Sequence, residues 1–234
     1  MKIAMLGLGK MGGNMSARLI RNGISVVGFD NNQSLIKDLV ETENLIGSTS
    51  IEDALSKLDE QKIIWMMLPA GEITETQINE LIPHLSSGDI IIDGGNSNYK
   101  QSVKRGRMLK EHHIGFMDCG TSGGVWGLDN GYCLMVGATP EVAKVVEPVL
   151  KALAVTPETG WLHAGPVGSG HFTKMIHNGI EYGMMESFAE GLELLKGREE
   201  YAIDVAEVTE LWRHGSVVRS WLLDLTAEAL KGDQ

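Results

Sequence analysis

The chain is poor in positive charge and in long apolar runs, and each shortage excludes a class of protein. Its 234 residues include 20 Lys and Arg against 31 Asp and Glu, so the formal net charge at pH 7 is −11. Because nucleic-acid backbones are recognised chiefly by clustered Lys and Arg, this balance argues against general nucleic-acid binding. The longest apolar runs, such as residues 63–69, are too short to cross a bilayer. We therefore expect neither a nucleic-acid partner nor a membrane partner.

Cysteine is also scarce, and its spacing predicts no metal site in a chain that we expect to be cytoplasmic because it lacks both a bilayer-length run and a secretory pattern. Cys119 and Cys133 are the two cysteines, and their spacing matches no metal or redox motif. A lone disulfide is disfavoured in a reducing compartment, so we expect two buried thiols without a function. Residues 1–8 run directly into glycines without a secretory cleavage pattern. The 43% apolar content is enough for one substantial core and part of a second.

A glycine fingerprint follows the first apolar run of the chain. Residues 2–6 have the composition of a buried strand, and Gly7, Gly9 and Gly12 follow with the spacing G-x-G-x-x-G before a helical pattern. The first glycine permits a tight turn, the second lets the backbone approach a pyrophosphate, and the third allows close helix packing. The sequence therefore predicts a dinucleotide site at the start of this helix, with Leu8, Lys10 and Met11 in the same loop.

Asp30 makes the fingerprint more specific. A second strand pattern, at residues 24–29, ends at Asp30, where a carboxylate can bind the ribose hydroxyls of a dinucleotide. Asn31 and Asn32 follow, so no arginine stands there to neutralise a 2′-phosphate, and Asp30 would repel one. We therefore predict NAD rather than NADP as the cofactor. The alternative for Asp30 and Asn32 is a role in turn formation or helix capping.

The next segments predict a parallel α/β sheet. Strand patterns at 63–68 and 89–93 alternate with helical patterns near 32–41, 72–84 and 98–112. Ligands of such sheets bind at the carboxyl ends of the strands, where two loops lie that would face the cofactor. These loops are Leu68-Pro69-Ala70-Gly71 and Asp93-Gly94-Gly95-Asn96-Ser97. Turn chemistry alone also accounts for their Pro and Gly residues.

Two further segments carry polar groups of interest. Between strand patterns at 114–118 and 132–137, Gly123 and Gly124 can turn successive backbone N–H groups toward a carboxylate, although a long glycine hairpin explains them equally well. In the helical pattern that starts at residue 168, the helix period places Lys174, His177 and Glu181 on one side, together with Asn178. Apolar surface for burial comes from the other side of that helix: Phe172, Met175, Ile176 and Ile180.

A basic cluster in the 98–112 helix predicts no site. Lys104, Arg105, Arg107 and Lys110 are best explained as the solvated face of this helix. We assign them no function.

Taken together, six segments in chain order resemble decarboxylating 6-phosphogluconate dehydrogenases of the β-hydroxyacid dehydrogenase superfamily. They are Gly7–Asn14, Met67–Gly71, Asp93–Ser97, Ser122–Gly124, Lys174–Tyr182 and Trp212–Arg219. The resemblance implies a Rossmann-like NAD-binding domain over residues 1–167 and an all-helical substrate and dimerisation domain over 168–234, bridged by a long helix near 168–196. The Asp30-Asn31-Asn32 pattern is similar to that of the shorter, NAD-linked members.

The resemblance also implies residue roles. Lys174 would be the general base and Glu181 the acid that protonates the substrate carbon after decarboxylation. The cofactor residues would be Gly7, Leu8, Gly9, Lys10, Met11, Gly12, Asp30, Asn31, Leu68, Pro69, Ala70 and Asn96. The substrate, 6-phosphogluconate, would meet Asn96, Ser122, Gly123, Gly124, His177, Asn178, Tyr182 and Arg219, the last two at its phosphate.

Members of that family extend well beyond Gln234, so we expect the helical domain to be incomplete here. Apolar side chains of the predicted helices near 204–231 would then leave surface uncovered, which predicts a homodimer. These side chains include Leu211, Trp212, Val217, Trp221, Leu222 and Leu225. Two alternative functions stay open: a non-decarboxylating dehydrogenase of a small 3-hydroxyacid, and a catalytically incompetent NAD-binding or regulatory protein.

Overall fold

The computed structural model describes residues 1–232, and its internal contacts divide the chain into two units. The first unit is Met1–Met175 and the second is Ile176–Gln234, so the division falls inside one helix, α8 (Ser169–Lys196). The predicted long helix near 168–196 is confirmed. Each unit is described separately below. Within the described residues, no helix is long and apolar enough to cross a membrane.

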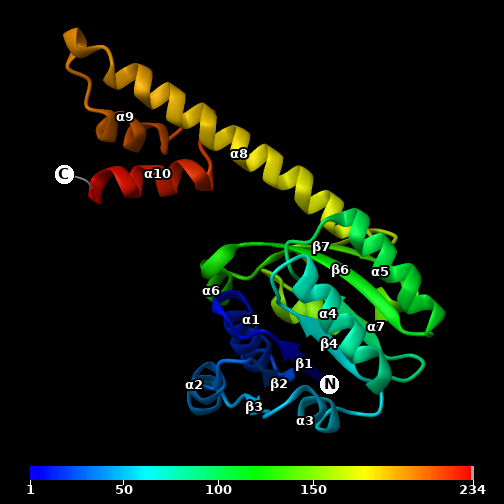
Figure 1. Cartoon of the computed structure of the whole chain (residues 1–234). Helices are drawn as coiled ribbons and strands as arrows, with labels where there is room; N and C mark the ends of the chain where they lie inside the picture. Colours follow the sequence, from blue (N-terminus) through cyan, green and yellow to red (C-terminus); the bar gives the residue numbers. More distant parts are fainter. Residues whose placement is uncertain (233–234) are drawn as a thin grey trace. The chain divides into compact units, whose positions relative to one another are not determined.

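The first unit is built on one eight-stranded sheet, and the predicted α/β class is confirmed (Figure 1). The strand order is β3-β2-β1-β4-β5-β6-β7-β8, and all neighbours are parallel except β6 and β7. The order reverses between β1 and β4, which is the place where a crevice forms at the carboxyl ends of the strands. The strands are β1 (Lys2–Leu6), β2 (Ser25–Phe29), β3 (Ile46–Gly47), β4 (Ile63–Met66), β5 (Ile90–Asp93), β6 (Gly115–Ser122), β7 (Cys133–Ala138) and β8 (Trp161–Gly165).

The central strands are continuous apolar runs because both faces of the sheet are covered by helices. Successive side chains point to opposite faces, so Ile3 and Met5 of β1 belong to one core cluster, and Ala4 and Leu6 to the other. The first cluster contains residues of α1 (Lys10–Arg21), α2 (Gln33–Glu43) and α7 (Pro140–Leu153). The second contains residues of α3 (Ile51–Ser56), α4 (Glu72–Leu81) and α5 (Tyr99–Glu111).

Short-range signals set the helix starts. Asn32 caps α2 by accepting a hydrogen bond from the Ser34 N–H, which confirms its capping alternative, and Asn98 caps α5 in the same way through the Lys100 N–H. Two short helical segments, η2 (Gly124–Trp126) and α6 (Gly127–Asn130), occupy the connection between the antiparallel strands β6 and β7. The glycine segment is therefore a long hairpin connection, as one of the two interpretations predicted.

The prediction that both cysteines are buried is right for Cys119 and wrong for Cys133. Cys119 on β6 is buried, and burial raises the pKa of its thiol well above the usual range. Cys133 is exposed, because it is the first residue of β7 and pairs with Ser122 at the last position of β6, where the pair of strands ends.

The second unit consists of helices. After α8 come η3 (Glu199–Tyr201), α9 (Val205–Trp212) and α10 (Trp221–Gly232). Arg213 bonds to Glu210 and to Asp224 of α10, and Lys231 contacts the same Glu210 at 2.9 Å. Hydrogen bonds from Lys231 and Arg213 lower the pKa of Glu210 to about 2. Polar contacts thus join α9 to α10.

Much apolar surface stays exposed in this chain. Leu223 and Ala227 are fully buried, whereas Leu211 and Trp221 are 65% and 51% exposed. The expectation that α8 buries its apolar side is wrong for this chain, because the four side chains concerned are 44–61% exposed. They are Phe172, Met175, Ile176 and Ile180.

Candidate active site

The glycine fingerprint has the geometry of a dinucleotide loop. Gly7 has φ +90°, and a Cβ there would lie 2.5 Å from the carbonyl oxygen of Met67. A Cβ on Gly12 would collide with the carbonyl oxygen of Gly7, so this glycine lets α1 pack against the turn. A Cβ on Gly9 would meet open space, and because Gly9 has no side chain, none caps the first turn of α1. The N-terminus of α1 therefore fits an anionic phosphate.

Asp30 lies at the end of β2 and holds this loop. Its Oδ2 accepts a hydrogen bond from the Leu8 N–H at 2.7 Å, and its Oδ1 accepts one from the Asn32 N–H at 2.8 Å. Gly7 donates from its own N–H to the carbonyl of Phe29 at 2.9 Å. The carboxylate is therefore also a loop-forming group, as its alternative interpretation predicted, and it lies beside the glycine turn where an acidic residue binds ribose.

The loops after β4 and β5 lie against each other. Gly94 donates from its N–H to the carbonyl of Met66 at 2.9 Å, and a Cβ on Gly95 would lie 2.7 Å from the carbonyl oxygen of Leu68. Asn96 is exposed between the buried residues Gly95 and Ser97. The structure thus brings residues 68–71 and 93–97 together at the carboxyl ends of β4 and β5 and presents Asn96 to solvent.

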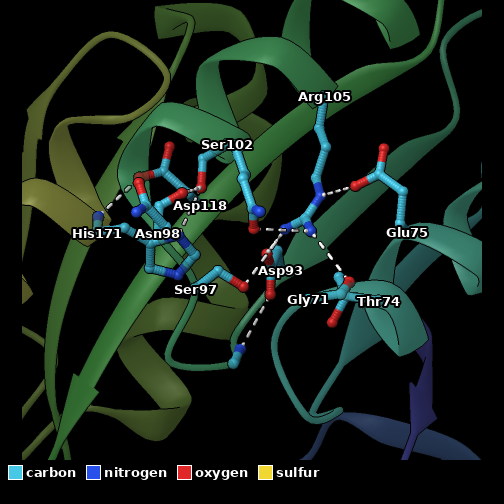
Figure 2. A network of polar contacts seen from close by, with 12 residues as sticks. Gly71, Thr74, Glu75, Asp93, Ser97, Asn98, Ser102, Arg105, Asp118 and His171 are labelled. Atoms are coloured by element: carbon cyan, nitrogen blue, oxygen red, sulfur yellow. Dashed lines mark hydrogen bonds and ion pairs between the residues drawn. The ribbon is translucent and has the colours of Figure 1, made fainter.

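Arg105 does not lie on a solvated helix face, so this prediction is wrong. Its side chain is 1% exposed, and its Nη1 donates to Asp93 Oδ2 at 2.9 Å and to Ser97 Oγ at 3.3 Å. Its Nε donates to Glu75 Oε2 at 2.9 Å and its Nη2 to the carbonyl of Gly71 at 3.5 Å. Figure 2 shows the guanidinium between these groups. One buried cation therefore joins the loop after β4 to the loop after β5.

The sequence contains two indications that Arg105 is buried, although its charged neighbours on α5 suggested an exposed helix face. Asp93 ends an apolar strand and is itself 1% exposed, so it needs a buried cation or several N–H donors. Among the five basic residues of α5, the helix period places Arg105 three residues after Ser102 and four before Leu109, both of which are fully buried. Lys104 and Lys110 are exposed, as predicted.

The glycine connection between β6 and β7 is held against α1. Asn14 donates from Nδ2 to the carbonyl of Val125 at 3.2 Å, and Arg18 donates to the carbonyl of Leu128 at 3.1 Å. Gly123 and Gly124 have φ +125° and +53°, conformations that L residues with side chains rarely adopt. The residues that directly follow the candidate carboxylate-binding segment 122–124 are therefore tied to the helix that begins at the dinucleotide loop.

Lys174 packs on the same strand that leads into this segment. A Cβ on Gly120 of β6 would collide with the Cβ of Lys174, so the lysine stem lies directly over the glycine. The Lys174 side chain is half-buried. The first unit thus places Lys174 over Gly120 of β6, and Gly120 lies two residues before Ser122 of the predicted carboxylate-binding segment.

The remaining predicted residues belong to the second unit. His177 Nδ1 lies 3.2 Å from Asn178 Oδ1 and 3.6 Å from Glu181 Oε2, so these polar groups of α8 meet one another. Tyr182 is 68% exposed. Arg219 is exposed in the connection between α9 and α10, not on a helix, and its backbone N–H donates to the carbonyl of Ser216. The assignment of these residues to a substrate site stays a prediction.

Family models match both parts of the chain. The NAD binding domain of 6-phosphogluconate dehydrogenase matches residues 2–162, and the C-terminal domain of 6-phosphogluconate dehydrogenase matches residues 170–234. The chain belongs to the 6-phosphogluconate dehydrogenase family. This confirms the family that the six segments indicated. The Rossmann-like domain followed by a helical region is confirmed with it.

Named relatives agree with this assignment. YqeC of Bacillus subtilis, provisionally named a 6-phosphogluconate dehydrogenase, is 45% identical to this chain. The matched region covers 100% of this chain and 77% of YqeC. The NAD(+)-dependent, decarboxylating 6-phosphogluconate dehydrogenase of Haloferax volcanii is 38% identical over 99% of this chain and 75% of the relative. The decarboxylating enzyme of Caenorhabditis elegans is 38% identical, and the chain spans 49% of its length.

Solved structures give the same picture of the family. The 6-phosphogluconate dehydrogenase of Plasmodium falciparum superposes with a TM-score of 0.91 and 27% identity over 98% of this chain and 51% of that one. That protein is described in complex with its cofactor NADP+ and with its substrate 6-phosphogluconate. The 3-hydroxyisobutyrate dehydrogenase of Mycobacterium tuberculosis superposes with a TM-score of 0.78 at 24% identity, which shows a shared fold.

We predict that Arg105→Met destabilises the first unit by about 3–5 kcal/mol, because it leaves the buried Asp93 carboxylate without its cation. Chemical denaturation followed by tryptophan fluorescence measures this loss. Lys104→Met is the matched control, since Lys104 is the exposed neighbour on the same helix. Equal midpoints for the two variants would contradict the anchoring role of Arg105.

Proposed function

We propose that the chain carries the residues for oxidative decarboxylation of 6-phosphogluconate to ribulose 5-phosphate and CO2, with reduction of NAD. The observation that supports this most strongly is the packing of Lys174 on Gly120, next to the glycine segment 122–124. A base, an anion-binding backbone segment and a dinucleotide loop are the parts that this reaction requires. The name of the Haloferax volcanii relative supports both the NAD dependence and the decarboxylation.

In the proposed reaction Lys174 acts first as a base and then as an acid. It removes the proton of the C3 hydroxyl of the substrate, while NAD, held by the loop 7–12 and Asp30, would supply the acceptor for the hydride of C3. The resulting β-keto acid loses CO2, because the C3 carbonyl oxygen takes up the electrons of the breaking bond and Lys174 protonates that oxygen. Glu181 then protonates the former C2 of the substrate, which becomes C1 of ribulose 5-phosphate, while the enol hydroxyl returns its proton to Lys174. Passage of that proton to Glu181 through solvent restores both groups.

We propose the following binding roles. Asn96, Ser122, Gly123 and Gly124 hold the carboxylate end of the substrate, His177 and Asn178 hold its hydroxyls, and Tyr182 and Arg219 hold its phosphate. A planar guanidinium suits phosphate because it donates paired, charge-assisted hydrogen bonds. NAD is held by the loop 7–12, by Asp30 and Asn31, by residues 68–70 and by Asn96.

The decisive assay follows NADH and CO2 together in the presence of 6-phosphogluconate. We predict one CO2 for each NADH, and a fall in kcat of about 10²–10⁴-fold for Lys174→Met with an unchanged Kd for NADH. Lys144→Met, an exposed lysine of α7, is the control. NADH without CO2 from a small 3-hydroxyacid would favour the non-decarboxylating alternative. Saturable NADH binding without any turnover would favour the non-catalytic one.

The cofactor preference depends on the end of β2. We predict that the chain binds NADH more tightly than NADPH, because Asp30 repels a 2′-phosphate. Asn31→Arg should strengthen NADPH binding about tenfold to a hundredfold, the effect of one or two charge-assisted hydrogen bonds. Fluorescence titration measures both constants. Gln61→Arg adds the same charge before β4, at the other end of the sheet, and should leave the ratio unchanged. Tighter NADPH binding by the unaltered chain would contradict the prediction.

We also propose a homodimer, with cytoplasmic localisation remaining a prediction of the sequence. Leu211, Val217 and Trp221 of the second unit are 65%, 101% and 51% exposed, which is more apolar surface than a monomer usually presents. Light scattering should give twice the chain mass, and Trp221→Glu should shift it toward the monomer. Val40→Glu, which alters an exposed valine of α2, should not. A monomeric unaltered chain would contradict the proposal.

A further inference from the structure

Asp118 is a fully buried carboxylate that the proposed reaction does not use. It lies on β6 between Asp93 of β5 and Gly137 of β7, and it has no exposed surface. Its Oδ1 accepts a hydrogen bond from the Gly168 N–H at 2.6 Å, and its Oδ2 accepts one from the His171 N–H at 2.8 Å. Both donors belong to the start of α8, so one side chain joins the strand to the first turn of this helix.

This carboxylate suits the position electrostatically and sterically. Backbone N–H groups at a helix start have no partner within the helix, and the helix dipole favours a negative charge there. Burial raises the pKa of Asp118, while the N–H groups of Gly168 and His171 act in the opposite direction. A Cβ on Gly137 would lie 2.5 Å from Asp118 Oδ1, and one on Gly170 would collide with the Asp118 carbonyl. The strand and the start of the helix therefore pack closely around the carboxylate, with glycine at both points of contact.

The ring of His171 makes a second connection to the helix start. Its Nδ1 lies 2.7 Å from Ser102 Oγ of α5, and both residues are buried (Figure 2). Ser102 Oγ also lies 3.4 Å from the carbonyl of Asn98, which precedes α5. Although Ser, His and Asp are all present, they do not form a nucleophilic triad, because Asp118 bonds to the backbone of His171 and Ser102 is inaccessible.

Lys174 lies one helical turn beyond His171, and its stem packs on Gly120, two residues beyond Asp118 on β6. Asp118 and Gly120 therefore face the same side of the sheet, toward α8. A shift of the helix start along the strand would carry Lys174 with it.

We propose that Asp118 is a positioning residue that sets the amine of Lys174 relative to β6, with the Ser102–His171 hydrogen bond as a second restraint. The inference rests on the proposed function in one respect, namely that Lys174 is the base. It predicts that loss of the Asp118 carboxylate changes the position of the Lys174 amine even in a variant that still folds.

Asp118→Asn tests this against a close structural match. Asp89 is also a buried carboxylate, and it also accepts two backbone hydrogen bonds, from the Lys62 N–H and the Ser86 N–H, both at 2.8 Å. It precedes β5, at the end of the sheet away from Lys174. In each Asn variant the side-chain NH₂ replaces one carboxylate oxygen, so it faces a backbone N–H that has lost its acceptor. We expect kcat with 6-phosphogluconate to fall about tenfold to a hundredfold in Asp118→Asn, while Asp89→Asn keeps its kcat. KM and the Kd for NADH should change less than twofold in both.

A second readout does not depend on turnover. The rate at which acetic anhydride labels Lys174, measured by peptide mass spectrometry relative to the exposed Lys144, should change at least threefold in Asp118→Asn and stay constant in Asp89→Asn. Should Asp118→Asn fail to fold, Ser102→Ala replaces it and should shift the labelling in the same direction. Unchanged labelling in the folded variant, or equal loss of kcat in both Asn variants, would overturn the proposal. Altered labelling in Asp118→Asn, combined with no turnover by the unaltered chain, would reject the proposed function but retain the positioning role.

Discussion

The arrangement of the candidate site depends on a buried ion pair at the carboxyl edge of the sheet. Arg105 and Asp93 are each 1% exposed, and the same guanidinium reaches Ser97, Glu75 and the carbonyl of Gly71. A buried charge is tolerated only when its partners compensate the lost hydration. Because one rigid guanidinium makes all of these contacts, the position of each partner restricts the positions of the others. The result is that the loops after β4 and β5, which come from separate parts of the chain, keep one relative position.

Glycines at three points of close approach fix further segments of the candidate site against one another. Gly12 lets α1 lie on the turn at Gly7, Gly95 lets the loop after β5 lie on Leu68, and Gly120 lets Lys174 lie on β6. In each case a Cβ would occupy the space of a neighbouring atom. Glycine is needed at these points because the backbone of one segment approaches another segment of the chain, rather than for flexibility.

The family assignment and the geometry support each other while remaining independent. Sequence comparison places both parts of the chain in the 6-phosphogluconate dehydrogenase family. Separately, the first unit gathers a dinucleotide loop, the glycine segment predicted to bind a carboxylate, and Lys174 around the ends of β1, β4, β5 and β6. A shared fold alone would not distinguish decarboxylation from simple oxidation, because 3-hydroxyisobutyrate dehydrogenase has a similar fold. The proposal of a decarboxylating reaction rests instead on the presence of both Lys174 and Glu181 in the sequence of α8.

By itself, the sequence determined the α/β class, the dinucleotide loop, the strands and helices through residue 112 except β3 and α3, and a helix that begins near residue 168. These features follow from local patterns: apolar runs, glycine spacing and helix period, each of which acts over a few residues. Local pattern also led to errors. Arg105 was grouped with its charged neighbours, and Cys133 was expected to be buried like Cys119.

Only the tertiary structure decided what each buried polar group contacts. Asp93 and Arg105 lie 12 residues apart in the chain, and Asp118 and Gly168 lie 50 apart, so no local pattern connects them. Their pairing results from strand order and from the direction in which α5 and α8 cross the sheet. A charge in the sequence predicts only that a partner is required if the side chain is buried, and the fold determines both the burial and the partner.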